Sequence, residues 1–131
     1  MRRRTLPETA DSIAPDGSEV RLLVHGDAGG LAHFQLSAGE MSRPVQHRSV
    51  EELWYFVGGH GEMCIGTEVT EVAAGLAVRI PPRTRFQFLS RGPEPLAAVA
   101  VTMPKWPAEG DAIDAAPHWV RDDAGRITPA G

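Results

Sequence analysis

The stretch GEMSRPVQHRSVEELWYFVGGHG, residues 39–61, decides the fold and holds the side chains best suited to chemistry. It places His47 and Glu52 ahead of an apolar run, residues 53–57, which ends at two glycines. Bulky aromatic and β-branched residues favour a half-covered strand, and the glycines allow a tight turn after it. Imidazole and carboxylate side chains bind first-row metals and transfer protons near neutral pH. The stretch therefore predicts a strand with a reactive pair beside it.

Short apolar segments separated by glycine and proline turns continue on both sides of this stretch, and none shows a convincing helical period. The strand candidates are residues 20–24, 31–37, 62–65, 69–72, 76–80, 85–89 and 96–103. This pattern predicts an all-β sandwich or barrel. We expect an extended arm over residues 1–19, the barrel over residues 20–103, and an irregular tail over residues 104–131 that packs on the barrel.

Residues 39–61 resemble the first motif of the cupin superfamily, in which a glycine precedes His-x-His, a glutamate and a second glycine at fixed spacing. Aligned from Gly39, the two motif histidines fall on Val45 and His47, the glutamate on Glu52 and the last glycine on Gly59. The resemblance covers roughly residues 31–103. It implies a cupin-type jelly roll, that is, a double-stranded β-helix barrel.

The second cupin motif, a glycine followed by Pro-x-Gly, a histidine and an asparagine, also matches in spacing. It starts at Gly75 and reaches Pro81; Arg83 stands in place of the glycine, Phe86 in place of the histidine and Ser90 in place of the asparagine. The spacing within and between the motifs is kept, whereas the metal ligands are not.

Only His47 and Glu52 remain of the four usual cupin metal ligands. Valine and phenylalanine have no lone pair to donate, and two protein ligands bind a metal weakly. We therefore expect no metal and no other cofactor. A metal-dependent enzyme would need a recruited ligand, for which the candidates are His33, Gln35 and His60.

Strand alternation sends every second side chain of residues 52–56 to the same face as Glu52. In a cupin barrel that face is internal, and the side chains of the second-motif strand lie opposite. We expect His47 and Glu52 to be catalytic. The expected substrate-binding residues are Trp54, Phe56, Phe86, Phe88 and, at the mouth of the pocket, Arg85 as an anion ligand.

Such a pocket suits a small organic molecule. The leading hypothesis is a metal-independent isomerase, epimerase or cyclase-like enzyme in which His47 and Glu52 shuttle a proton. The alternatives are a non-catalytic binding or sensing module, a metal-dependent enzyme with a recruited ligand, and a structural role in which the pair merely satisfies its own hydrogen bonds.

Composition and net charge exclude several classes of binding partner and site. The net charge of −4 without a basic stripe argues against nucleic acid, and no apolar run approaches the ~20 residues that span a bilayer. The basic start, residues 1–4, is followed by no apolar segment, so we expect no secretory signal. The single cysteine, Cys64, allows no internal disulfide and no cysteine zinc site. We expect a cytoplasmic protein.

The tail contains two tryptophans, Trp106 between two prolines and Trp119 beside a valine. We expect both to dock on the barrel or on a partner subunit, because docking buries a large apolar area. Residues 102–107, TMPKWP, resemble the ending of a group of small bacterial cupins with a single first-motif histidine. No reaction follows from that resemblance, whereas the cupin resemblance in general implies a homodimer.

Overall fold

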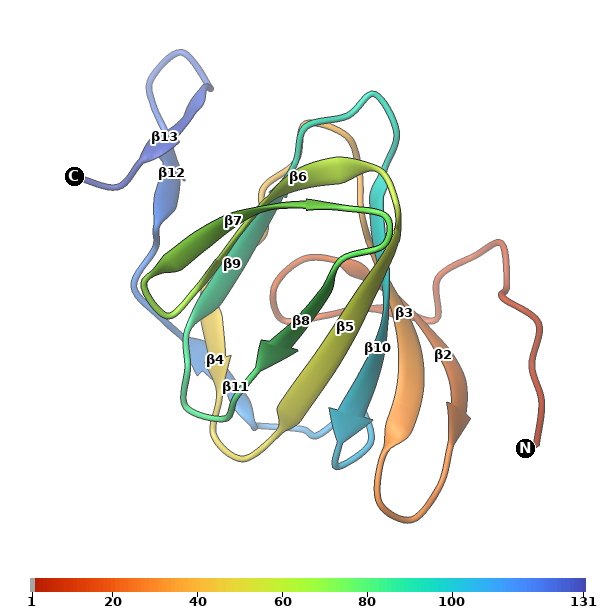
Figure 1. The fold of residues 1–131 in the computed structure, drawn as a ribbon. Helices are drawn as coiled ribbons and strands as arrows, with labels where there is room; N and C mark the ends of the chain where they lie inside the picture. Colours follow the sequence, from red (N-terminus) through yellow and green to blue (C-terminus); the bar gives the residue numbers. More distant parts are fainter. Residues whose placement is uncertain (1) are drawn as a thin grey trace.

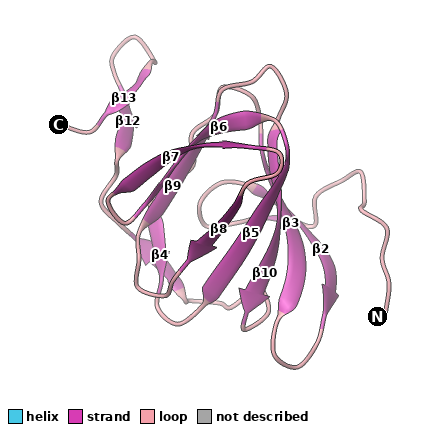
Figure 2. Cartoon of the chain, in the orientation of Figure 1, coloured by secondary structure: helices cyan, strands magenta, loops and turns pink. Residues whose placement is uncertain are grey.

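The computed structural model describes residues 2–131, which form thirteen strands and no helix (Figures 1 and 2). The strands are β1 (Ser12–Ile13), β2 (Glu19–His25), β3 (Gly30–Leu36), β4 (Val45–His47), β5 (Glu51–Gly58), β6 (His60–Ile65), β7 (Glu68–Ala73), β8 (Ala77–Ile80), β9 (Phe86–Ser90), β10 (Leu96–Met103), β11 (Ala112–Asp114), β12 (Trp119–Arg121) and β13 (Ile127–Pro129). The all-β jelly roll predicted from the sequence is confirmed. None of the described residues builds a helix capable of crossing a membrane.

Two antiparallel sheets enclose the core. The first has the order β1-β2-β3-β10-β5-β8, and the second has the order β11-β4-β9-β6-β7. From β4 onward the chain passes repeatedly between the sheets, so that each sheet is built from strands distant in sequence (Figure 1). This crossing places the end of β4 and the start of β5 on opposite walls at one end of the barrel.

Strand β5 alternates between the core and the outer surface, as the sequence predicts. Trp54 is 2% exposed, whereas its neighbour Tyr55 is 52% exposed. Trp54 stacks on Phe34 of β3 with ring centroids 5.1 Å apart and meets Phe88 of β9 edge-on at 5.2 Å. These aromatic contacts join the two sheets and fill the centre of the barrel.

The tail is more regular than the sequence predicts. Residues 104–111 lack regular structure and cross the lower end of the barrel in Figure 1, where prolines remove backbone donors. Beyond them, however, β11 extends the second sheet beside β4, and β12 pairs with β13 in a hairpin. The tail therefore adds a strand to the barrel as well as covering it.

Buried Gln87 of β9 attaches the tail to the outside of the second sheet. Its Oε1 accepts hydrogen bonds from the backbone N–H groups of His118 and Trp119, and its Nε2 donates to the carbonyls of Ser42 and Trp119. Trp119 is buried in a small cluster that includes Leu89. In the structure Trp119 thus packs against the second sheet, and Trp106 lies edge-on to Phe34 with ring centroids 6.4 Å apart.

Candidate functional site

The expected reactive pair meets at the lower end of the barrel. His47 ends β4 and Glu52 lies near the start of β5, so the short connection between them joins the two sheets. The imidazole Nε2 lies 3.7 Å from Oε2 of Glu52. His47 is 7% exposed and Glu52 is 1% exposed, which places both groups in a largely water-free setting.

Trp54 fixes the orientation of the Glu52 carboxyl. Its indole N–H donates to Oε1 of Glu52 over 2.9 Å, because the two side chains stand on the same face of β5. Burial raises the pKa of Glu52 to about 7; this Trp54 hydrogen bond opposes the rise, and the charges of Asp16 and Asp111 add to it. Since Oε1 already accepts the indole proton, the carboxyl proton belongs on Oε2, the oxygen that faces His47.

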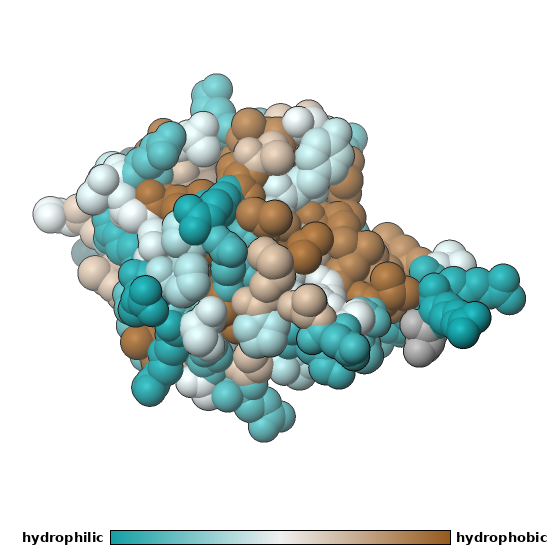
Figure 3. Space-filling model, turned by 60° about the horizontal axis from the view of Figure 1, so that its bottom comes forward, coloured by the Kyte–Doolittle hydropathy of each residue, from teal (hydrophilic) through white to brown (hydrophobic). Residues whose placement is uncertain are grey.

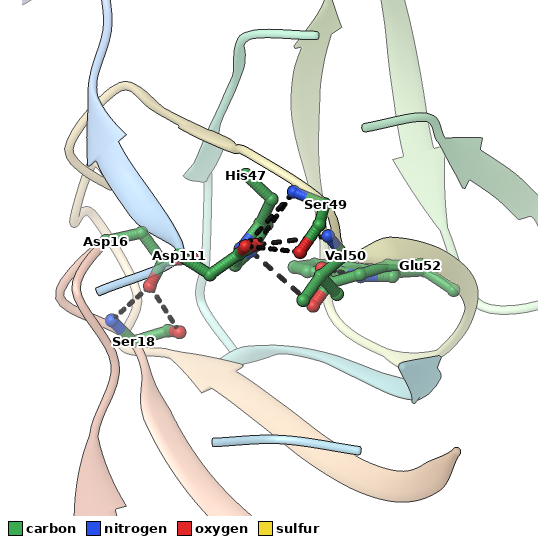
Figure 4. A network of polar contacts seen from close by, with 8 residues as sticks. Asp16, Ser18, His47, Ser49, Val50, Glu52 and Asp111 are labelled. Atoms are coloured by element: carbon green, nitrogen blue, oxygen red, sulfur yellow. Dashed lines mark hydrogen bonds and ion pairs between the residues drawn. The ribbon is translucent and has the colours of Figure 1, made fainter. Parts of the chain in front are cut away.

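Asp111, which the sequence did not single out, holds the other side of His47. Its Oδ2 lies 3.2 Å from Nδ1 of His47 and accepts the backbone N–H of Val50 at 3.0 Å, while Oδ1 accepts the Ser49 hydroxyl at 2.6 Å. Figure 4 shows Asp111 at the centre of these contacts. An ionised carboxylate here requires the proton of neutral His47 on Nδ1, which leaves the lone pair of Nε2 directed at Glu52.

The pKa values follow from the same contacts. Burial tends to raise the pKa of Asp111, but the hydrogen bonds from Ser49 and Val50 and the charge of His47 hold it below its ordinary value. Burial lowers the pKa of His47, which Asp111 only partly opposes. His47 is therefore neutral at neutral pH, next to a carboxyl group that is close to half protonated.

A second acid missed by the sequence reasoning, Asp16, comes from the N-terminal arm. Its Oδ1 accepts the backbone N–H and the hydroxyl of Ser18 at 2.9 and 2.6 Å, as Figure 4 shows. Burial raises the pKa of Asp16 despite these bonds. Asp16 lines the same cavity as His47 and Glu52, whereas Asp111 contacts His47 without lining that cavity.

The cavity beside the pair has a volume of only about 10 Å³, enough for roughly one water molecule. Phe86 narrows it by stacking on the His47 ring, with centroids 5.9 Å apart. Val45 and Trp54 line it as well. The aromatic chamber expected from the sequence is thus present but almost filled.

Three of the expected substrate-binding residues do not reach this cavity. Phe56 and Phe88 are buried in the core beyond Trp54 and form no part of the cavity wall. Arg85 points away from the barrel mouth, where it donates to the carbonyls of Gly66 and Ala116 at 2.8 and 3.0 Å. Arg85 therefore links the tail, at Ala116, to the turn at Gly66. Trp54 and Phe86 do line the cavity.

The donor set does not fit a resident metal. Val45 and Phe86 occupy two ligand positions of the motif and have no lone pair to donate, which leaves only Nε2 of His47 and the carboxyl group of Glu52 as donors from the motif. The proposed recruits are also misplaced: His33 and Gln35 alternate with the core-facing residues of β3, and His60 is exposed. Within residues 2–131 no three His, Cys, Asp or Glu side chains are grouped to hold a metal ion.

The turn of the second motif has a left-handed backbone conformation at Arg83, which stands in the position of the motif glycine. Arg83 has φ +57°, a left-handed conformation that favours glycine, and it is the only non-glycine residue with positive φ among residues 2–131. Its N–H donates to the carbonyl of His47 over 2.7 Å. The strained turn therefore helps to position the imidazole.

Comparison with known proteins agrees with this architecture. The cupin domain family model matches residues 32–102. The uncharacterised protein MJ1618 of Methanocaldococcus jannaschii is 30% identical over 106 residues, which cover 77% of this chain and 85% of that protein.

Solved structures with the same fold are more distant in sequence. PAC13 of Streptomyces, in a variant solved with uridine, has a TM-score of 0.68 at 16% identity, covering 88% of this chain and 92% of PAC13. A Klebsiella pneumoniae protein with a double-stranded β-helix domain has a TM-score of 0.62 at 20% identity, covering 80% of this chain and 91% of its own. The match to the family model over residues 32–102 shows that the chain belongs to the cupin family.

Proposed function

We propose that the protein is a small-molecule-binding cupin whose Glu52 and His47 exchange protons with the bound molecule without a metal. The observation that carries this proposal is the pairing of Oε2 of Glu52 with Nε2 of His47 at 3.7 Å. One atom is a proton donor in the acid form, and the other is a lone-pair acceptor. Their pKa values, one raised to about 7 and one lowered, suit proton transfer near neutral pH.

The distance between the two groups supports a ligand that comes between them. An O–H···N hydrogen bond requires about 2.7 Å between heavy atoms, so at 3.7 Å neither group satisfies the other. A hydroxyl group of a ligand can bond to both, because its oxygen accepts the proton of Glu52 and its own proton is donated to Nε2 of His47. Neutral His47 would remove a proton from an activated C–H group through Nε2, and protonated Glu52 would return one at a second atom or face. Transfer of the captured proton from His47 to Glu52 would then restore the resting pair.

This chemistry defines the reaction class. Removal and return of a proton changes no oxidation state and consumes no second substrate, as in an isomerase or epimerase. A cyclase-like reaction uses the same two steps, with an internal nucleophile as the group that loses its proton. Asp111 is the positioning residue, because it keeps the lone pair of His47 on the side of Glu52.

A second candidate function is binding or sensing without turnover. It is favoured by the small volume of the cavity beside the pair, about 10 Å³, because a molecule held outside this cavity would not reach Glu52 unless a wall moves. PAC13, a neighbour in fold, was solved with uridine, which supports a barrel of this kind as a site for a small organic molecule.

Equilibrium dialysis against a mixture of cellular metabolites separates the two functions. The full chain and the variants Glu52→Gln and His47→Gln are dialysed in parallel, and both compartments are measured by liquid chromatography with mass spectrometry, in which the chromatography separates isomers of equal mass. For an enzyme, we expect the wild type to convert one compound into an isomer or cyclised product, while Glu52→Gln retains the compound unchanged. Retention by all three proteins without conversion supports sensing, and retention by none contradicts both functions.

A further inference from the structure

Outside the small cavity lies a larger groove of about 390 Å³, which we call the outer groove. Its walls are residues 13–15 of the N-terminal arm, residues 106–110 of the tail, and Arg43, His47 and Ala112. Figure 3 turns this end of the barrel toward the reader and shows hydrophobic surface gathered between hydrophilic patches. The outer groove has the volume of a small-ligand site and reaches the imidazole of the reactive pair.

Trp106 separates the outer groove from the inside of the barrel. It lines the outer groove, the cavity beside Glu52, and a further cavity of about 40 Å³ behind it. It is the only residue shared by all three walls. Displacement of its indole therefore joins the three spaces into one.

The segment that carries Trp106 is attached mainly at its two ends. Residues 104–110 contain no strand and lie between the end of β10 at Met103 and the anchored carboxylate of Asp111. Trp106 itself is only half-buried. A segment with few backbone hydrogen bonds moves at lower free-energy cost than a strand does.

The buried hydroxyl group of Thr102 lies behind the Trp106 indole and is unsatisfied. Thr102 is fully buried, and its Oγ1 has no hydrogen-bond partner. It lines the 40 Å³ cavity and is the register partner of Glu52 across β10 and β5. Because an unpaired buried hydroxyl costs free energy, a ligand that reaches this space gains by bonding to it.

Arg43 supplies the charge at the other end. It is the only lysine or arginine in the outer groove, it is exposed, and its guanidinium forms no hydrogen bond or ion pair with any part of residues 2–131. Its backbone is fixed, since its N–H donates to the carbonyl of Asp16 over 2.7 Å. A free guanidinium on a fixed backbone binds carboxylate or phosphate in a bidentate manner.

We propose that the ligand of this site, whose use for proton transfer rests on the proposed function, is a small planar organic anion. Its ring displaces Trp106 and packs against Phe34, and its carboxylate or phosphate group binds Arg43. Phe34 already receives one ring edge-on from Trp106 at 6.4 Å and a second one stacked, from Trp54. A planar ring fits the place of an indole, whereas a bulky saturated group does not.

The test is ¹⁹F NMR of the full chain labelled with 5-fluorotryptophan. The three tryptophans give three resonances, assigned with single Trp→Phe variants. The probes are phenyl phosphate, benzoate and the neutral ring phenol. We expect at least one anion to shift the Trp106 and Trp54 resonances and to leave the Trp119 resonance unchanged. Phenol should bind at least about tenfold more weakly than that anion. A response to phenyl phosphate alone assigns a phosphate ligand, and a response to benzoate alone assigns a carboxylate.

Charge variants make the test specific. Arg43→Gln should weaken binding of the anions by about tenfold and leave phenol unchanged. Arg48→Gln, which removes an exposed arginine outside the groove, should change neither, and Glu109→Gln, inside the groove, should leave anion binding equal or stronger. Trp106→Ala should strengthen anion binding, because no indole has to leave.

Three outcomes overturn the proposal: neither anion moves the Trp106 resonance, phenol binds as well as the anions do, or Arg43→Gln has no more effect than Arg48→Gln. Conversion of only neutral compounds in the dialysis experiment would reject the ligand class and keep the acid–base function. Anion binding at Trp106 without any conversion would keep the ligand class and reject the acid–base function.

Discussion

Trp54 donates its indole N–H to Oε1 of Glu52 over 2.9 Å, and this contact directs the other carboxyl oxygen at His47. Both residues lie on the inner face of β5, so the strand itself sets their separation. The contact accounts for a buried carboxyl group that has one fixed acceptor oxygen and one oxygen free to carry a proton. It links the aromatic core of the barrel directly to the proposed chemistry.

Glu52 makes the fold less stable as the pH rises. Its pKa is about 7 in the folded chain against an ordinary 4.5, so the folded state holds the proton more tightly. Its contribution is therefore favourable below about pH 4.5 and is lost progressively up to pH 7, on the order of 3 kcal/mol in all. Relative to wild type, Glu52→Gln should gain stability over this window in urea unfolding series at several pH values.

A matched control for this series is Glu71→Gln on the exposed side of β7, which removes a carboxyl group from solvent. The stability difference between Glu52→Gln and wild type should vary between pH 5 and 8 by more than the difference for this control does. An equal pH dependence of the two variants would contradict the raised pKa of Glu52.

Asp111→Asn should disturb both stability and the imidazole. An amide group cannot accept hydrogen bonds on both atoms, so its NH₂ group must face either the Ser49 donors, which bond to Oδ1, or Val50 and His47, which share Oδ2. We expect a loss of about 2 kcal/mol in unfolding free energy, typical of an unsatisfied buried group. In ¹⁵N NMR the proton of neutral His47 should move from Nδ1 to Nε2. Retention of the Nδ1–H form would contradict the positioning role of Asp111.

Gln87→Leu should release the tail. The substitution removes four hydrogen bonds that join β9 to Ser42 and to residues 118–119, and it leaves their backbone groups unpaired. Hydrogen exchange should accelerate in β12 and β13 while the amides of β5 and β10 stay protected. The control Gln35→Leu, on the outer side of β3, should leave the tail protected. Unchanged exchange in β12 for Gln87→Leu would exclude Gln87 as the attachment point.

Arg83→Gly should stabilise the protein. A side chain in the left-handed region costs about 1–2 kcal/mol, which glycine avoids, although glycine gives back part of the gain in unfolded-chain entropy. We expect a net gain of about 0.5–1 kcal/mol in the unfolding free energy. Gly39→Ala at φ +81° serves as the reverse control and should destabilise. A loss of stability on Arg83→Gly would indicate that the arginine side chain itself holds the turn.

The fold and the central pair were predictable because they depend on local order in the chain. Alternation within residues 52–56 fixes which side chains face inward, and the motif spacing places His47 beside Glu52. Asp111 and Asp16 were not predictable in this way. They reach the site only through the paths of the tail and the arm, which no short spacing encodes: the contact of Asp111 with His47 spans 64 residues.

The opposite error is a residue expected at the site that lies outside its cavity. This applies to Arg85, Phe56 and Phe88. Their positions on the strands are as expected, but their role depends on what covers them. Arg85 is taken up by the carbonyls of Gly66 and Ala116, and Trp54 fills the space between the two phenylalanines and the cavity. Neither the path of the tail nor the side-chain volume within a barrel follows from strand alternation alone.

The most direct test of the central claim is the titration of the Glu52 carboxyl carbon by ¹³C NMR, with the resonance identified by its absence in Glu52→Gln. A buried carboxyl group that shares its site with neutral His47 should titrate with a midpoint near pH 7. A midpoint near 4.5, the ordinary value for glutamate, would contradict the acid–base pair and leave His47 and Glu52 as an inert structural contact.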